Sequence, residues 1–432
     1  MQSFHPTRML HRQSGRLLYL AIVLLIMTRA VDASAQIIRV KVADYPTLGN
    51  PTSAIETSDG RYVFVSVTNV GAPNFAGPDA AAGSRKDVVA GIQIFRVKRH
   101  KLIAAGFLRT GGAGANGLVL LPGDKTLAMG VGDDGVVFLD VPGLLSGTAV
   151  PKVISQGEKA GTFDIAVTPD GKYIFAANEY GVIDGQRGNV GIVATGIDRE
   201  GRILNPKKIR QIPVGDVVPS LTISHDGKRV YVATELVLSN KAVAIAGETT
   251  PILTRSDCVQ KKGTPAWSNG FISVIDVELA TGTSPTENPI AARVAAGCSP
   301  VRLAESADGS FLFVTARGDN AVFQYNAAIL STGSEHSFLR AIPSGGEAPV
   351  GLRLFDGDRL LAVANSNRFA STPGNLAIFA VGKSPALLQT LPTGLFPRNI
   401  GTSALGRELL LTNYSSRTFS LIQVSVLSSS RP

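Results

Sequence analysis

The feature that most constrains the fold is a short turn-and-strand unit that recurs along the chain. Its clearest copy is residues 168–178, where Pro-Asp-Gly-Lys leads into the apolar run Tyr-Ile-Phe-Ala-Ala-Asn. A second copy is residues 224–234, and weaker copies begin at Ser58 and Ala307. An Asp-Gly pair before a run of aromatic and β-branched residues is typical of a tight turn that enters a strand. Repetition of one such unit over a long chain predicts a solenoid, a propeller or an array.

Seven copies of the unit cover almost all of the chain after its N-terminal segment. They align on the turn residue that precedes the strand: Gly60, Asp124, Gly171, Gly227, Gly309, Asp358 and Gly406. Each copy expands into four strand-like runs, which is the pattern of a propeller blade. The seventh copy lacks a fourth run, and residues 37–42 offer a spare one. The alternative is two separate β domains, but no Pro/Ser-rich linker divides the chain.

The sequence therefore predicts an all-β, seven-bladed β-propeller with four antiparallel strands per blade. We expect the domain to span residues 36–427, with the N-terminal strand closing the last blade so that no sheet edge stays open. Residues 428–432 are expected to form a disordered tail.

The repeat resembles the YVTN-type β-propeller repeat, in which Asp-Gly-Lys leads into Tyr-Val-Thr-Asn. The matching stretches end the second strand of four copies: Phe175–Asn178, Tyr231–Thr234, Ala362–Asn365 and Leu410–Asn413. The resemblance covers roughly the whole predicted propeller and implies the fold. The superfamily includes secreted binding and surface proteins as well as lactonases similar to 6-phosphogluconolactonase, so the resemblance does not decide between binding and catalysis.

Residues 1–35 are predicted to be a secretory signal peptide. A basic stretch ending at Arg16 precedes an apolar core at residues 17–27, and Ala33-Ser34-Ala35 is a small-residue cleavage site. The alternatives are an uncleaved anchor or a chance apolar N-terminus. Cleavage would leave a secreted or periplasmic chain with no membrane span. The chain has a net charge of +9, but its Lys and Arg residues form no dense run interleaved with aromatic residues. Nucleic acid is therefore not an expected partner.

The chain has two cysteines, Cys258 and Cys298. Both fall in predicted loops on the face where the inner strands begin, which we call the top face, and they belong to adjacent blades. In an oxidising compartment such a pair predicts one disulfide, and the alternative is two free thiols. It would fasten the long insertion at residues 235–269 to the blade that follows.

The candidate ligand-binding residues lie where the inner strands start and the second strands end, because these positions converge at the top of the central channel. They are Asn116, Asp164, Asn178, Glu179, Glu235, Arg302, Arg317, Arg353, Asn365 and Arg398. The planar guanidinium group of arginine can donate two parallel hydrogen bonds to a carboxylate or a phosphate, so we expect an anionic ligand. The alternative is a set of rim charges paired within or between blades.

No metal site and no cofactor is predicted. The three histidines of the predicted mature chain show no metal-ligand spacing, and no nucleophile motif occurs. Residues 112–117 match G-x-G-x-x-G, but a short strand rather than a helix follows, so a dinucleotide site is not expected.

The favoured function is a binding or scaffold protein, monomeric, that presents its top-face loops to an anionic small molecule, a glycan or an envelope protein. The alternative is a lactonase-like hydrolase with its site at the top of the channel, in which Glu179 or Glu235 activates water and an arginine stabilises the oxyanion. A propeller subunit of a periplasmic dehydrogenase is a third, weaker possibility. A hydrolase should hold a buried carboxylate beside an arginine, whereas a scaffold should show a broad, shallow surface.

Overall fold

The computed structural model describes residues 37–71, 89–99, 101–111, 114–183, 186–235, 258, 269–284, 287–368, 370–382 and 384–427. The predicted signal peptide, the predicted tail and most of the insertion at 235–269 lie outside the described residues. By its internal contacts the chain divides into residues 40–425 and a second unit made of residues 1–39 and 426–432. Only the ends of two strands are described in that second unit, and the account below concerns residues 40–425.

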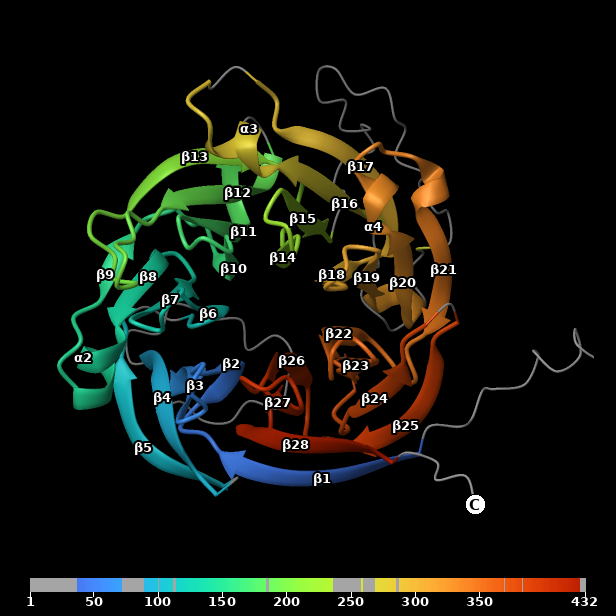
Figure 1. The fold of residues 1–432 in the computed structure, drawn as a ribbon, viewed down its shortest axis with the longest axis horizontal. Coiled ribbons are helices and arrows are strands. Elements are labelled where there is room, and N and C mark those ends of the chain that lie inside the picture. The colour runs from blue at the N-terminus through green and yellow to red at the C-terminus, as the bar shows by residue number, and fades with distance from the viewer. Residues whose placement is uncertain are drawn as a thin grey trace, which may run out of the picture. The chain divides into compact units, whose positions relative to one another are not determined.

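Seven four-stranded sheets are arranged as blades around one axis (Figure 1). Each blade is read outward from the axis. Blade one consists of β2 (Asn50–Glu56), β3 (Tyr62–Val70), β4 (Val89–Lys98) and β5 (Lys101–Arg109), and blade two of β6 (Leu118–Leu120), β7 (Thr126–Val131), β8 (Gly135–Asp140) and β9 (Lys152–Ile154). Blade three consists of β10 (Thr162–Val167), β11 (Tyr173–Ile183), β12 (Gln186–Ala194) and β13 (Lys207–Pro213). Blades four and five are β14 (Ser220–Ile223), β15 (Arg229–Thr234), β16 (Asn269–Asp276) and β17 (Ile290–Cys298); and β18 (Pro300–Glu305), β19 (Phe311–Ala316), β20 (Ala321–Asn326) and β21 (Phe338–Pro343). Blades six and seven are β22 (Pro349–Phe355), β23 (Leu360–Asn365), β24 (Asn375–Ala380) and β25 (Ala386–Pro392); and β26 (Pro397–Thr402), β27 (Glu408–Asn413), β28 (Thr418–Leu427) and β1 (Ile37–Pro46). The predicted fold class is thus confirmed.

The closure of the last blade by the N-terminal strand is also confirmed. β1 lies beside β28 as the outermost strand of blade seven, and it is longer than the six residues predicted. Ser420 Oγ donates to Asp44 Oδ1 at 2.5 Å. The Tyr45 ring packs 5.5 Å from Phe419, and its hydroxyl accepts from the backbone N–H of Leu102 in blade one at 3.3 Å. β1 therefore contacts both blades at the seam, the junction where blade seven meets blade one.

The recurring Ser/Thr-x-Asp-Gly sequence forms a closed hydrogen-bonded turn. In the copy at Ser224, its hydroxyl donates to Asp226 Oδ1 at 2.7 Å and accepts from the N–H of Arg229 at 2.8 Å. Gly227 has φ 72°, a conformation that favours glycine. The hydrogen bond from Ser224 is the main cause that lowers the pKa of Asp226. The repeat that identifies the blades is thus a structural turn, and His225 within it is exposed.

At these turns, carboxylates also join neighbouring blades. In each bond a carboxylate accepts from the backbone N–H that follows the Ser/Thr of the preceding blade. The pairs are Asp124 with Ser58 at 2.5 Å, Glu305 with His225 at 2.6 Å, Asp358 with Ala307 at 2.5 Å and Glu56 with Ala404 at 2.6 Å. The last pair joins blade one to blade seven, so the same bond type crosses the seam.

Between blades, apolar side chains form the core. One cluster joins Tyr231 and Ile272 of blade four to Leu303 and Phe323 of blade five. Short helices follow the third strand of several blades: α2 (Val141–Ser146), α3 (Val277–Thr281) and α4 (Ala327–Leu330). Each begins after an Asp or Asn whose side chain accepts a hydrogen bond from the first turn, the usual N-cap arrangement. Among the described helices, none has the length and apolar character to cross a membrane.

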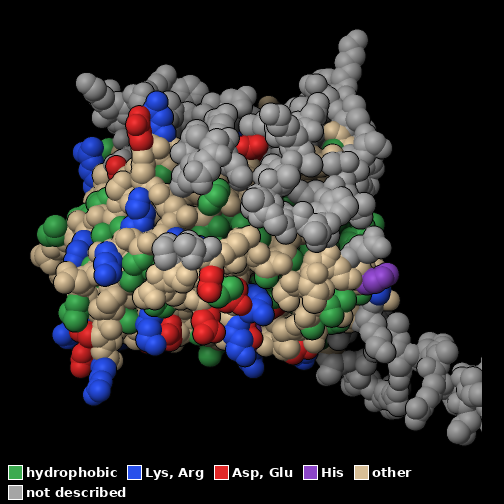
Figure 2. Space-filling model, turned by 90° about the horizontal axis from the view of Figure 1, so that it is seen from above, with side chains coloured by type: hydrophobic (Ala, Val, Ile, Leu, Met, Phe, Trp, Pro, Cys, Tyr) green, Lys and Arg blue, Asp and Glu red, His purple; other side chains and the backbone are tan. Residues whose placement is uncertain are grey.

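The described surface carries charges of both signs. Figure 2 shows Lys and Arg side chains interspersed with Asp and Glu along the face in view, and no continuous basic patch appears on the described part of it. On the described part of this face, basic side chains are therefore spread among acidic ones rather than gathered in one area.

Candidate functional site

Seven charged side chains interact with one another where the inner strands begin, at the end of the ring opposite the Asp-Gly turns. We call this group the axial cluster, and its members are Asp164, Glu179, Glu235, Arg302, Arg317, Arg368 and Arg398. Six of them belong to the predicted set of ligand-binding residues. The seventh, Arg368, follows β23 in blade six. The cluster draws on blades three to seven, which only a ring can bring together.

Arg302 on β18 is one of the buried arginines of the cluster. It is 8% exposed, and its Nη1 donates to the carbonyl of Pro219 in the preceding blade at 2.8 Å. Its backbone N–H donates to Thr315 Oγ1 at 2.9 Å. Within the described residues, the Nε–H of Arg302 has no hydrogen-bond acceptor. A buried guanidinium with an unsatisfied donor is costly, which marks it as a place for an added acceptor.

A stack of aromatic rings and guanidinium groups runs through the cluster. The Phe163 ring of blade three has the guanidinium of Arg302 5.7 Å from its centre and that of Arg398 at 4.7 Å. Arg398 also lies 5.0 Å from the Tyr414 ring, and Arg368 lies 5.6 Å from Phe396. Blades three, five and seven are not neighbours, so these side chains meet near the axis. Cation–π contacts of this kind attract the guanidinium groups to the ring faces.

Glu179 lies at an irregularity in β11. Pairing with β12 shifts register between Asn178 and Val182, and Gly181 there has φ 88°. Such a bulge redirects a side chain that regular alternation would place elsewhere. Burial raises the pKa of the Glu179 carboxyl, against the lowering effects of Arg398, Arg368 and Arg317 and a hydrogen bond from Tyr180.

The other two carboxylates each interact with an arginine of the cluster. Glu235, at the end of β15, forms a buried ion pair with Arg317. Asp164 lies beside Arg302 and accepts hydrogen bonds from Ser220 and from the backbone of Ile165, while burial raises its pKa. Burial also lowers the pKa of Arg398 to about 10, so this guanidinium stays charged at neutral pH.

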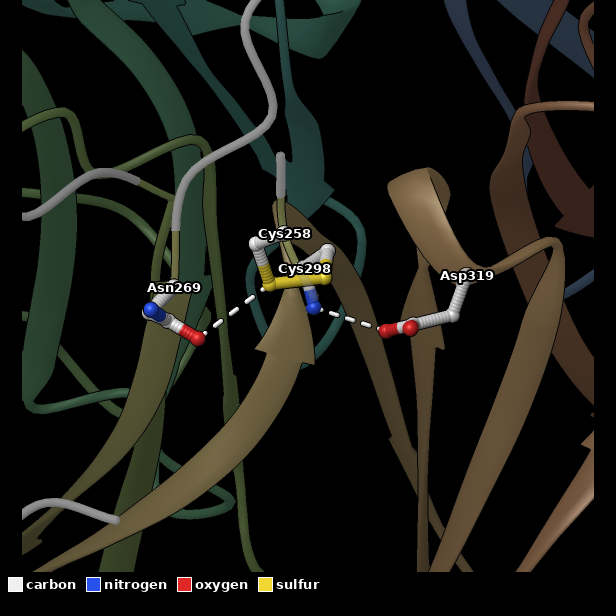
Figure 3. Close-up of a disulfide and its surroundings, with 4 residues drawn as sticks. All are labelled: Cys258, Asn269, Cys298 and Asp319. Carbon is white, nitrogen blue, oxygen red and sulfur yellow. Dashed lines mark hydrogen bonds between the residues drawn. A yellow bond between two sulfur atoms is a disulfide. The ribbon is translucent and has the colours of Figure 1, made fainter. Parts of the chain in front are cut away.

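The predicted disulfide between Cys258 and Cys298 is confirmed, with Cα atoms 5.5 Å apart. Its predicted placement between adjacent blades is wrong: Cys298 is the last residue of β17, so the bond ties the insertion to the outer strand of its own blade, blade four. Figure 3 shows it at the end of β17, where the N–H of Cys298 donates to Asp319 Oδ2 at 2.7 Å. Asp319 belongs to the 3-10 helix η1 (Arg317–Asp319), which begins with the cluster residue Arg317. The disulfide therefore sits directly against the element that presents Arg317.

Four of the predicted residues lie outside the cluster. Asn178 and Asn365 are buried within their blades, where their side-chain amides donate to Asn189 at 2.7 Å and to Asn375 at 2.8 Å. These bonds show what the asparagine of the repeat does locally: it links the second strand to the third. Asn116 donates to a backbone carbonyl of blade three at 3.4 Å. Arg353 is exposed, farther along its inner strand, and donates to the hydroxyl of Thr402 at 3.1 Å.

The sequence reasoning missed the aromatic part of the cluster. Phe163 directly precedes Asp164, Phe396 lies two residues before Arg398, and Tyr414 follows the next strand, β27. An aromatic residue next to a charged residue at the start of an inner strand was the available signal. Among the described residues, no group of three or more His, Cys, Asp or Glu is placed to hold a metal ion.

Comparisons with known proteins support the fold. No protein-family model matches the chain, and no curated protein sequence matches it. Among solved structures, a chain from "Crystal Structure of Mitotic Checkpoint Complex" is similar with a TM-score of 0.56 and 12% identity, covering 91% of this chain and 96% of that one. At this identity the likeness concerns the fold alone.

Proposed function

We propose that the protein is an exported β-propeller of the YVTN-repeat type that binds an anionic ligand at the axial cluster. The observation that carries this proposal is the buried Arg302, whose Nε–H lacks an acceptor in the described residues while its guanidinium lies beside Phe163 and near Arg398. A ligand carboxylate or phosphate would supply the missing acceptor.

The burial of the cluster favours a small molecule over a macromolecular surface. Arg302 and Arg317 are 8% and 7% exposed, so a ligand must reach in to contact them. A glycan or an envelope protein would instead be expected to rest on the loops of the top face. We expect the binding unit to be a monomer, which sedimentation of the mature chain would test.

Export is supported by two independent features. The disulfide suits an oxidising compartment, because thiols in the cytosol are mostly kept reduced. The predicted signal peptide supplies the route. We therefore propose a secreted or periplasmic location, which fractionation with an intact-mass measurement of the N-terminus would test.

The experiment for the binding proposal is calorimetric titration of the mature chain with a panel of anions: benzoate, gluconate, succinate and phosphate. Arg398→Gln should weaken binding by about 10- to 150-fold, because a hydrogen bond to a charged group contributes about 1.5–3 kcal/mol. The matched control is Arg61→Gln, which removes an exposed arginine at the Asp-Gly turn end. Equal weakening by both variants would refute the site, since it would show a general charge effect. No binding of any panel member would count against a small anion and favour a partner at the loops.

A second candidate function is lactone hydrolysis, and one observation favours it. Glu179 is a carboxyl with a raised pKa beside three arginines, the arrangement expected for a general base next to an oxyanion-stabilising group. In such a reaction water attacks the lactone carbonyl while Glu179 accepts its proton and a guanidinium stabilises the oxyanion. The C–O bond of the ring then breaks, and Glu179 returns the proton to the leaving ring oxygen. Turnover of a lactone panel that Glu179→Gln abolishes would support it. Absence of turnover by a folded mature chain would refute it.

A further inference from the structure

We infer that the axial cluster selects a carboxylate attached to an apolar body, and that Phe163 is the residue that positions Arg302 and Arg398 to receive it. This inference rests on the proposed function, since it concerns the same site. It adds the chemical class of the ligand and a positioning residue from a third blade.

The first argument is the contact between one ring and two guanidinium groups. The Phe163 ring of blade three lies 5.7 Å from the guanidinium of Arg302 in blade five and 4.7 Å from that of Arg398 in blade seven. Arg398 also lies 5.0 Å from the Tyr414 ring, and the Tyr414 hydroxyl accepts from Asn69 Nδ2 of blade one at 3.3 Å. An aromatic face attracts a guanidinium group but leaves the N–H groups at its edge in need of acceptors. The rings therefore bring two arginines to one place without using up their donors.

The second argument is the set of donors that remain. Arg302 Nη1 donates to the carbonyl of Pro219 at 2.8 Å, while its buried Nε–H has no acceptor within the described residues. Within the same part of the chain, the Arg398 side chain makes no hydrogen bond and no ion pair. Guanidinium donors lie in one plane and match the two oxygens of a carboxylate. A ligand carboxylate would thus satisfy donors that the protein leaves open on both arginines.

The third argument is the apolar character of the groups beside these donors. Phe163 and Phe396 are half-buried, and Tyr414 meets Phe396 edge-on with ring centres 5.5 Å apart. A ligand gains free energy when its apolar surface covers such rings, whereas hydroxyl groups placed against them lose water and gain no partner. The hydroxyl groups of gluconate and the additional oxygens of phosphate would meet that cost. The site therefore favours a carboxylate with an apolar body.

The role of Phe163 can be separated from packing, because leucine is apolar but has no aromatic face. Phe163→Leu should leave Arg302 and Arg398 charged and remove the ring that attracts both of them. Carboxylate affinity should then fall at least about fivefold. Phe163→Tyr keeps the ring, so its affinity should stay within about twofold of the native value. A purely structural role would not predict this difference between variants that fold equally well.

The test is calorimetric titration of the mature chain with benzoate, acetate, gluconate and phosphate at one pH and one ionic strength. Benzoate and acetate share the carboxylate and differ in the apolar body, whereas gluconate carries its carboxylate on a hydroxylated body. The matched control for Phe163→Leu is Phe338→Leu, since the Phe338 ring is 42% exposed on the outer strand β21. Thermal unfolding of each variant would show that it is folded.

We expect benzoate to bind at least about tenfold more tightly than acetate, gluconate or phosphate, because only benzoate combines the charge with a large apolar surface. We expect Phe163→Leu to weaken benzoate binding and Phe163→Tyr and Phe338→Leu to leave it within about twofold of the native value. Benzoate affinity that is unchanged in Phe163→Leu, or that Phe163→Tyr does not preserve, would overturn the positioning role.

The ligand class is decided with the native protein, so the outcome does not depend on whether Phe163→Leu folds. Equal affinity for benzoate and acetate, or tighter binding of gluconate or phosphate, would overturn the inference. If Arg398→Gln weakens that binding, the proposed function would remain standing. No binding of any of these anions or of succinate to the native protein would refute the proposed function itself.

Discussion

Tyr45 is the residue of β1 through which closure of the ring can best be tested. Most of β1 is exposed, and Tyr45 is its partly buried aromatic side chain. Its ring lies 5.5 Å from Phe419 and 6.3 Å from Phe95, so it packs against the last and the first blade together. We predict that Tyr45→Ala destabilises the whole propeller, although it changes a strand at the outer edge.

The magnitude can be estimated from these contacts. Truncating a fully buried large aromatic side chain costs about 3–5 kcal/mol, and partial burial reduces this to about 2 kcal/mol. Loss of the hydrogen bond from Leu102 adds about 0.5–1 kcal/mol. Unfolding entropy of about 2.1 cal/mol/K per residue gives roughly 0.8 kcal/mol/K for a propeller of this length. A loss of about 2.5 kcal/mol then lowers Tm by about 3 °C.

Calorimetry and urea titration of the mature chain would measure the effect. Tyr45→Phe keeps the ring and loses only the hydroxyl, so it should cost about 1 kcal/mol or less. Val42→Ala, on the same strand but 48% exposed, should stay within about 0.5 kcal/mol of the native protein. If Tyr45→Ala and Val42→Ala have the same Tm, Tyr45 does not hold the seam, and the reasoning fails.

Three further predictions follow from the fold. The Asp-Gly turns should make the protein acid-sensitive: the pKa of Asp226 is lowered in the folded state, so its stabilisation is present above the unfolded pKa of about 3.9 and is lost as pH falls toward the folded value. Urea titrations from pH 7 to pH 3 should show this, less steeply in Asp226→Asn. Gly401→Ala should cost about 1–3 kcal/mol, because its Cβ would meet a backbone carbonyl of blade one, whereas Gly382→Ala has open space and should be near neutral. The double variant Cys258→Ser/Cys298→Ser should lose about 2–4 kcal/mol in the same urea assay, since the disulfide closes a sequence separation of 40 residues; an unchanged midpoint would show that the disulfide does not contribute to stability.

The fold was predictable because its signals are local. The bonds between Ser224, Asp226 and the next strand lie within five residues, so they leave a readable pattern at each repeat. Counting strand-like runs per copy also showed that the seventh copy has only three, while residues 37–42 form a run that belongs to no copy. The pairing of Cys258 with Cys298 followed from placing both on one face of the expected ring.

The site was only partly predictable, because its contacts join distant blades. Arg302 and Arg398 could be placed near the top by their positions on inner strands, but their contact with Phe163 depends on side-chain reach across the axis. Asn178 had the position of a ligand-binding residue, yet its amide bonds to Asn189 inside the blade. A repeat pattern fixes where an inner strand begins and leaves the direction of each side chain undetermined.

The bond between Glu56 and Ala404 joins residues 348 apart in sequence, and this separation has a consequence for the order of folding. Each of the first six blades is made of consecutive strands, so it can form while the rest of the chain is still unfolded. Bringing Glu56 and Ala404 together closes a loop of 348 residues, which costs about 5 kcal/mol in chain entropy. Contacts across the seam offset this cost only once blade one and the strands of blade seven have both formed. Blade seven, which needs the first strand and the last three, should therefore be the final step of folding and the slowest.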